Sequence, residues 1–191
     1  MILSVLICSL ERRADQLQKL VDNLSRQKAA FETEVEILVC VDQGVKDGGI
    51  PIGDKRNTLV QSAKGDYVCF VDDDDDISPR YLELLIAACI EGPDCVGICG
   101  EIYWMEEMRV FEHSIAHKTF EQKAGVFLRP PNHINPVKRE IAVQFPFPSR
   151  SFGEDVCYAL DMVKAGALKT EVVVPESIYT YIPGNEVRHG D

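Results

Sequence analysis

Apolar and polar positions alternate in blocks along the first hundred residues. Residues 3–8 and 35–41 are apolar almost without interruption, as expected of strands buried on both faces of a parallel sheet. The stretch between them repeats its apolar residues at helical spacing, which predicts an amphipathic helix over 12–27. Further strands are predicted at 67–71 and 96–99, and further helices at 54–64 and from Ser78-Pro79 onward, with Ser78 as cap and Pro79 in the first position. This alternation predicts an α/β domain whose mostly parallel sheet carries helices on both faces.

The second half of the chain is less regular. No repeat, low-complexity linker or domain boundary interrupts it, so residues 1–191 are expected to form a single domain. The pattern predicts a turn-rich loop at 146–153, short helices at 135–142 and 155–164, and strands at 101–113, 125–128, 168–174 and 177–182.

Composition narrows the class of protein. Hydrophobic residues make up 46% of the chain, which indicates a globular core rather than disorder. The net charge of −11 disfavours nucleic acid and anionic lipid as partners. Seven cysteines, several within apolar stretches, favour a reduced, cytoplasmic setting, and no apolar run reaches the length of a membrane span.

Five consecutive aspartates, Asp72 to Asp76, follow the apolar strand at 67–71. Like charges this close repel one another unless a partner neutralises them. A solvated acidic loop or a weak calcium site would explain an arbitrary acidic run. Here, however, the run begins at a strand end, and Asp42 ends the preceding strand. Ligands of such sheets bind outside the carboxyl ends of the strands, so we expect Asp42 and the run on one rim, where they would suit Mg²⁺ or Mn²⁺.

The segment from Phe70 to Pro79 resembles the metal-binding segment of family 2 of the glycosyltransferases, where an Asp-x-Asp motif ends a strand and a proline opens the next helix. Three other segments resemble the family in the same order: residues 37–44, Lys55-Arg56-Asn57 and Gly153-Glu154-Asp155. Residues 3–9 resemble its first strand, although Cys8-Ser9-Leu10-Glu11 departs from the usual proline and Thr-Tyr-Asn. The resemblance implies a Rossmann-like A-type glycosyltransferase fold, with a nucleotide-sugar-binding half at 1–100 and an acceptor-side half at 101–191.

The resemblance also implies roles for single residues. Asp74 aligns with the metal-binding aspartate, with Asp72 and the late His189 as further metal ligands for Mn²⁺ or Mg²⁺. Asp75 and Asp76 are expected to be solvated neighbours. The implied donor-binding set is Ser9, Asp42, Arg56, Asp72 and Asp73.

A general base must take the proton of the attacking acceptor hydroxyl. By motif position this base is Asp155, with Glu154 as the alternative, although both would also suit the N-terminus of a helix. Single displacement in the family implies inversion at the anomeric carbon. Acceptor-side candidates are His133 and Lys138, in the polar stretch before the base. The expected reaction moves a sugar from a nucleotide donor, expected to be UDP-linked, to a hydroxyl of a glycan, a small molecule or another acceptor.

Several alternatives stay open at this point. A sugar-phosphate nucleotidyltransferase also uses metal and this fold, but the glycine-rich triphosphate loop it usually needs is missing after Ser9. A second alternative function is a non-catalytic module that binds a nucleotide sugar or a metal. For a transferase, a modified DNA base is an alternative acceptor. The spacing loosely typical of a zinc finger occurs at Cys95, Cys99, His113 and His117. However, cysteines four apart on a strand lie about 13 Å apart, too far for both to bind one ion.

Overall fold

The first third of the chain forms the parallel end of the sheet. The computed structural model describes residues 1–104 and 107–182. In it, β1 (Leu3–Leu10) pairs in parallel with β2 (Val35–Asp42) on one side and β3 (Tyr67–Phe70) on the other. Residues 3–9 of β1 are buried throughout, which accounts for their unbroken apolar run.

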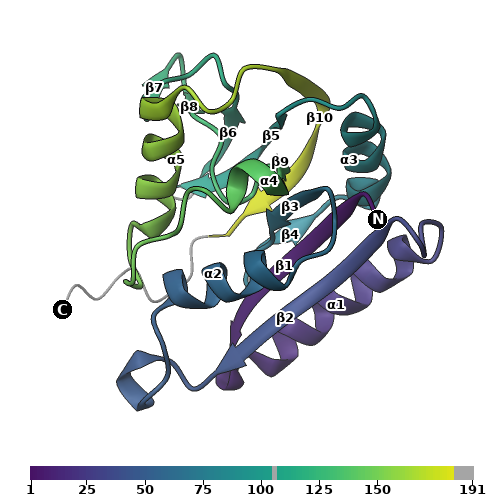
Figure 1. Ribbon diagram of the computed structural model, residues 1–191, viewed down its shortest axis with the longest axis vertical. Helices are drawn as coiled ribbons and strands as arrows, with labels where there is room; N and C mark the ends of the chain where they lie inside the picture. The colour runs from purple at the N-terminus through teal and green to yellow at the C-terminus, as the bar shows by residue number, and fades with distance from the viewer. Residues whose placement is uncertain (105–106, 183–191) are drawn as a thin grey trace.

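Helices cover both faces of this sheet (Figure 1). On one face α1 (Ala14–Lys28) and α3 (Tyr81–Ile90) pack against alternate β1 residues, and on the other α2 (Ile52–Ser62), α4 (Arg139–Ala142) and α5 (Glu154–Ala165) form a second apolar cluster. The predicted α1 stripe is thus the buried side of that helix, with Leu20 and Leu24 in the first cluster. The two-sided packing confirms the predicted fold class.

The remaining strands extend the sheet in mixed orientation. The short β9 (Val137–Lys138) pairs antiparallel with β3 and with β5 (Cys95–Trp104). Beyond it, β5 forms an antiparallel hairpin with β6 (Glu107–His113), β8 (Val126–Arg129) lies parallel to β6, and β7 (Glu121–Lys123) follows at the edge. The last strand, β10 (Glu171–Tyr181), pairs in parallel with β5 and antiparallel with β4 (Asp76–Ile77). Two 3-10 turns, Glu11–Arg13 and Val45–Asp47, follow β1 and β2.

Five of the predicted elements differ from the structure. The expected strands at 168–174 and 177–182 are one strand, β10, because register shifts between Val173 and Ser177 absorb Pro175, which cannot donate to the ladder. The strand predicted at 101–113 is divided between β5 and β6. The helix predicted at 135–142 is β9 followed by the short α4. Helix α3 begins only at Tyr81, after a turn in which the Ser78 hydroxyl accepts the Arg80 N–H.

None of the helices in the described ranges is both long enough and apolar enough to cross a bilayer.

Candidate active site

A cleft of about 890 Å³ opens at the carboxyl ends of β1 and β3. Its walls come from segments far apart in the sequence: the end of β1, the loop after β2, the start of the aspartate run, the 150–151 turn and the end of β10. The lining includes Ser9, Arg13, residues 43–47, Lys55, residues 72–74, Arg150, Ser151, Tyr181 and Ile182. The rim predicted from the strand order is therefore a real concavity that contains Asp72, Asp73 and Asp74.

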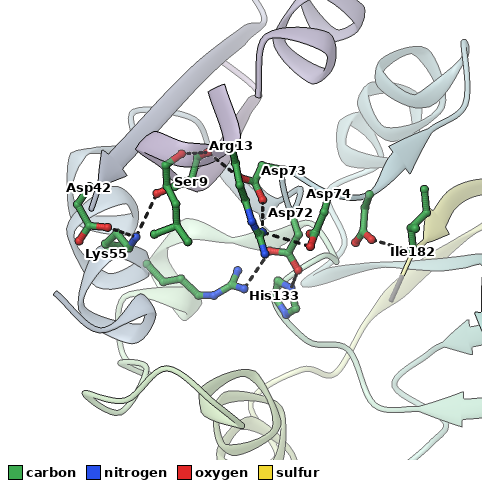
Figure 2. A network of polar contacts seen from close by, with 12 residues as sticks. Ser9, Arg13, Asp42, Lys55, Asp72, Asp73, Asp74, His133 and Ile182 are labelled. Carbon is green, nitrogen blue, oxygen red and sulfur yellow. Dashed lines mark hydrogen bonds and ion pairs between the residues drawn. The ribbon is translucent and has the colours of Figure 1, made fainter. Parts of the chain in front are cut away.

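Asp72 is held between Arg56 and His133 (Figure 2). One carboxylate oxygen lies 3.0 Å from Nη2 of Arg56, and the other lies 3.1 Å from Nε2 of His133. Burial alone would raise the pKa of Asp72, but the charges of Arg56 and His133 outweigh it and hold the pKa well below its ordinary value. Asp72 is therefore ionised, with both oxygens engaged by the protein.

Arg56 lies beneath the cleft and not in it. Its side chain is almost fully buried, its Nε lies 3.2 Å from Oε1 of Glu154, and its guanidinium carbon lies 4.8 Å from the centre of the Phe70 ring. Neither Arg56 nor Glu154 lines the cleft. The structure therefore places Arg56 behind the cleft lining, where it forms a buried ion pair with Glu154, the alternative base.

Asp73 and Asp74 share a cation that the sequence reading missed. Nη1 of Arg13 lies 2.7 Å from Asp73 and 3.2 Å from Asp74 (Figure 2). Ser9, predicted to bind donor, donates its hydroxyl to Asp73 over 2.5 Å. Burial raises the pKa of Asp74; Arg13 opposes this shift, while the charges of Asp72 and Asp73 add to it. Negative charge at Asp74 is therefore only partly compensated by the protein.

The last two aspartates of the run differ from each other. Asp76 is half exposed, as expected, with its carboxylate 3.6 Å from the Lys19 ammonium. Asp75 is not solvated: it is 7% exposed, accepts the Tyr179 hydroxyl over 2.6 Å and accepts the Ile182 N–H over 2.8 Å. Burial, helped by the charge of Asp72, raises the pKa of Asp75 to about 8. Asp75 thus fastens the end of β10 to the site.

Asp42 shapes the loop that forms one wall of the cleft. It accepts the N–H groups of Gly44 and Ile50 and lies 2.6 Å from the ammonium of Lys55. Burial would raise the pKa of Asp42, but Lys55 and the two N–H groups outweigh it and lower the pKa. The Lys55 ammonium is also within 3.2 Å of the Ser9 carbonyl and lines the cleft. Lys55 is a second cation that the sequence reading missed, although it opens the Lys-Arg-Asn segment.

His133 connects Asp72 to the predicted base. Its Nε2 faces Asp72, and its Nδ1 lies 3.6 Å from Oδ2 of Asp155. That Nδ1 is buried and makes no hydrogen bond with the described residues. Asp155 lies in the first turn of α5, which follows Gly153 at φ 69°, a conformation that glycine adopts without strain. The structure therefore places His133 and Asp155 next to the aspartate run.

Two other predicted residues are not brought to the site. Lys138 lies in β9, where its ammonium is 3.2 Å from Asp94. Asp94 immediately precedes β5, so Lys138 is at the opposite end of the sheet from the cleft, and the structure does not bring it to the site. His189 lies outside the described residues.

No three His, Cys, Asp or Glu side chains within residues 1–104 and 107–182 converge so as to hold a metal ion unaided. The residues with zinc-finger spacing are engaged elsewhere. Cys95 is buried in β5, the Cys99 thiol donates to the Glu176 carbonyl, His113 is hydrogen-bonded to Asn135, and His117 pairs with Glu112.

Comparison with known proteins agrees with the fold. Residues 52–146, about half of the chain, match the family model described as glycosyl transferase family 2. The structure is similar to Staphylococcus aureus TarS 1–349, with a TM-score of 0.67 and 16% identity, over 95% of this chain and 60% of that one. It is also similar to the complex of TarS 1–349 with UDP-GlcNAc, with a TM-score of 0.66 and 16% identity, over 100% of this chain and 60% of that one. The catalytic domain of Drosophila β1,4-galactosyltransferase 7, in complex with xylobiose, gives a TM-score of 0.62 and 14% identity, over 99% of this chain and 74% of that one.

The chain thus spans about 60% of the TarS 1–349 chain that it matches. No curated protein sequence matches it significantly.

Proposed function

Because the chain belongs to glycosyl transferase family 2, we propose that it transfers a sugar from a nucleotide-diphosphate donor to an acceptor hydroxyl. A UDP-linked donor is favoured, since structures of the similar TarS 1–349 hold UDP-GlcNAc and UDP. One observation carries the proposal: Asp72, Asp73 and Asp74 line a cleft at the end of β3, and His133 connects them to Asp155.

The carboxylate oxygens of the cleft suit a hard divalent ion, Mn²⁺ or Mg²⁺. Mg²⁺ is commonly held by one or two carboxylates together with substrate phosphates, so a complete protein cage is not required. Asp74 is the best-placed ligand because its side chain is 22% exposed in the cleft and burial, together with its acidic neighbours, raises its pKa. Asp72 is the proposed second ligand, in exchange for part of its contact with His133 or Arg56. When bound, the ion would act as a Lewis acid on the diphosphate and stabilise it as a leaving group.

The cations of the cleft suit the donor phosphates. Lys55 and Arg13 both line the cleft, and each is held in place by carboxylates of the same rim. We assign to them the neutralisation of diphosphate charge, while the loop that Asp42 organises, residues 43–47, faces the nucleoside. Ser9 positions Asp73 through its hydroxyl.

Asp155 is the proposed general base. The acceptor oxygen attacks the anomeric carbon as the bond to the nucleoside diphosphate breaks, and the hydroxyl proton passes to the Asp155 carboxylate. His133 lies between Asp155 and Asp72 and keeps the two carboxylates on either side of one imidazole. Direct displacement in one step would invert the anomeric configuration.

A reducing, cytoplasmic setting is part of the proposal. All seven cysteines are free, and four of them are buried. Burial raises the pKa of Cys8 and of Cys69 to about 12, so both remain thiols at neutral pH and pack as small apolar groups.

Donor binding tests the proposed function. Isothermal titration of UDP-GlcNAc, with and without Mn²⁺, should show Mn²⁺-dependent binding that Asp74→Ala weakens at least tenfold, or about 1.4 kcal/mol. Asp76→Ala is the matched control, because Asp76 belongs to the same run but does not line the cleft. Equal affinities for the wild-type protein and Asp74→Ala, while Mn²⁺ still promotes binding, would remove Asp74 from the metal site.

A further inference from the structure

One face of the outer sheet carries aromatic rings and a cation beside the cleft. Tyr181 of β10 pairs with Ile102 of β5, and Trp104 lies two residues further along β5, on the same face because side chains alternate along a strand. We call the group formed by Trp104, Phe120, Phe127, Arg129 and Tyr181 the aromatic-cation face. Tyr181 belongs to this face and also lines the cleft, so the two surfaces are continuous.

Four members of this face, Trp104, Phe127, Arg129 and Phe120, contact one another in sequence. The Trp104 and Phe127 rings meet edge to face, with centroids 6.0 Å apart. The Arg129 guanidinium lies 5.6 Å from the centre of the Phe127 ring and 5.9 Å from that of Phe120. Trp104 is 43% exposed, an unusual position for a large apolar ring that has no role at the surface. The face therefore offers a ring-lined surface with one cation set into it.

Arg129 differs from the other arginines near the cleft. Arg13 and Arg56 each contact two carboxylates. Within the described part of the chain, no carboxylate lies at ion-pairing distance from Arg129 and its guanidinium donates no hydrogen bond; it contacts the Phe120 and Phe127 rings instead. Burial lowers the pKa of Arg129, which reflects the cost of removing this charge from water. In a chain of net charge −11, a half-buried cation with no acidic partner among residues 1–104 and 107–182 indicates a site for an anion from outside.

The aromatic-cation face is also close to the proposed base. The Tyr181 phenol and the Asp155 carboxylate partly offset the lowering of the Arg129 pKa, so both lie within electrostatic range of Arg129.

We propose that the aromatic-cation face binds the acceptor, and that the acceptor is a carbohydrate or polyol carrying an anionic group. The inference rests on the proposed glycosyl transfer. The apolar face of a sugar ring would pack on Trp104 and Phe127, while its phosphate or carboxylate accepts charge-assisted hydrogen bonds from Arg129. Arg129 then selects anionic over neutral acceptors.

Trp104 supplies the probe, because it is the single tryptophan of the chain. Glucose 6-phosphate, glucuronate and glucose are titrated into the protein, in the presence of UDP and Mn²⁺, while Trp104 fluorescence is recorded. The two anionic sugars should change the fluorescence saturably and bind at least about tenfold more tightly than glucose, as expected of a charge-assisted hydrogen bond. A difference between the two anions identifies phosphate or carboxylate as the preferred group.

Arg129→Gln should abolish the preference for the anionic sugars, and Arg129→Lys should keep part of it, which guards against a variant that merely fails to fold. Arg80→Gln is the matched control, because Arg80 is exposed and pairs with Glu83 and Glu176. Equal binding of all three sugars, no saturable change with either anion, or an Arg129→Gln variant that retains the preference would each overturn the inference.

Donor binding measured on the same samples separates this inference from the proposed function. Intact Mn²⁺-dependent binding of UDP-GlcNAc without an anionic preference overturns the acceptor inference alone. An anionic preference without any donor binding overturns the proposed function and leaves an anionic-sugar site.

Discussion

Arg56 should be more important for stability than for donor binding. It is buried between Asp72 and Glu154 and stacks on Phe70, so Arg56→Met would keep much of the packing but leave two carboxylates without their cation. Removing one partner of a buried ion pair costs about 3–5 kcal/mol, because the remaining charge is uncompensated. That is a large part of the roughly 5–15 kcal/mol that holds a domain folded. At this chain length it corresponds to a fall in Tm of roughly 6–20 °C.

Urea unfolding followed by circular dichroism measures this loss. Glu154→Gln in the Arg56→Met background should recover about 1–2 kcal/mol, since it neutralises the more buried of the two stranded carboxylates. Arg80→Met is the control: Arg80 is half exposed in its ion pairs, so this change should cost far less stability than Arg56→Met. A loss below about 1 kcal/mol for Arg56→Met, or strictly additive effects of the two changes, would contradict the stabilising role of the buried Arg56 ion pairs.

Two further predictions follow from single contacts. Burial lowers the pKa of His113 to about 3, so the folded protein binds one proton fewer than the unfolded chain between that value and about 6.5. The free energy of unfolding should therefore fall as the pH decreases from about 6.5 toward 3, by up to about 1.4 kcal/mol per unit, and urea titrations of His113→Gln should show a shallower slope; equal slopes would contradict the cause. Arg13→Gln removes the cation between Asp73 and Asp74, so isothermal titration should show tighter Mn²⁺ binding without donor and weaker UDP-GlcNAc binding with Mn²⁺. Unchanged Mn²⁺ affinity would show that Arg13 does not share the charge of Asp74.

The local pattern of apolar residues was enough to predict the parallel strands of the sheet and the rim of the site. Residues 3–9 form a strand buried on both faces, so their apolar run carries a clear signal, and the carboxyl ends of parallel strands necessarily meet at one edge. Asp42 and Asp72 were predicted on that edge for this reason. The A-type glycosyltransferase fold followed from the order of the motifs, and the family match agrees with it.

The partners of the acidic residues could not be predicted from local pattern, because they come from distant parts of the chain. Arg13 is 60 residues from Asp73, and His133 is 61 residues from Asp72, so no local spacing connects them. Asp75 was expected in solvent, but Tyr179 and Ile182, more than a hundred residues away, enclose it.

The second half was harder to predict because its elements are short or interrupted. The segment before the base was read as one polar loop, yet His133 faces the site while Lys138, five residues on, lies in β9 at the other end of the sheet. A change from loop to a two-residue strand leaves no periodicity in the sequence.

The role of Asp155 as general base is tested most directly by measuring the release of UDP from UDP-GlcNAc, in the presence of Mn²⁺ and an acceptor, by the wild-type protein and by Asp155→Asn. If Asp155 takes the acceptor proton, Asp155→Asn should bind donor as tightly as the wild-type protein but lose at least about a hundredfold in turnover, the usual contribution of a general base. Turnover within a few-fold of wild type in Asp155→Asn, with donor binding intact, would contradict the assignment of the base and with it the paired site formed by the aspartate run and α5.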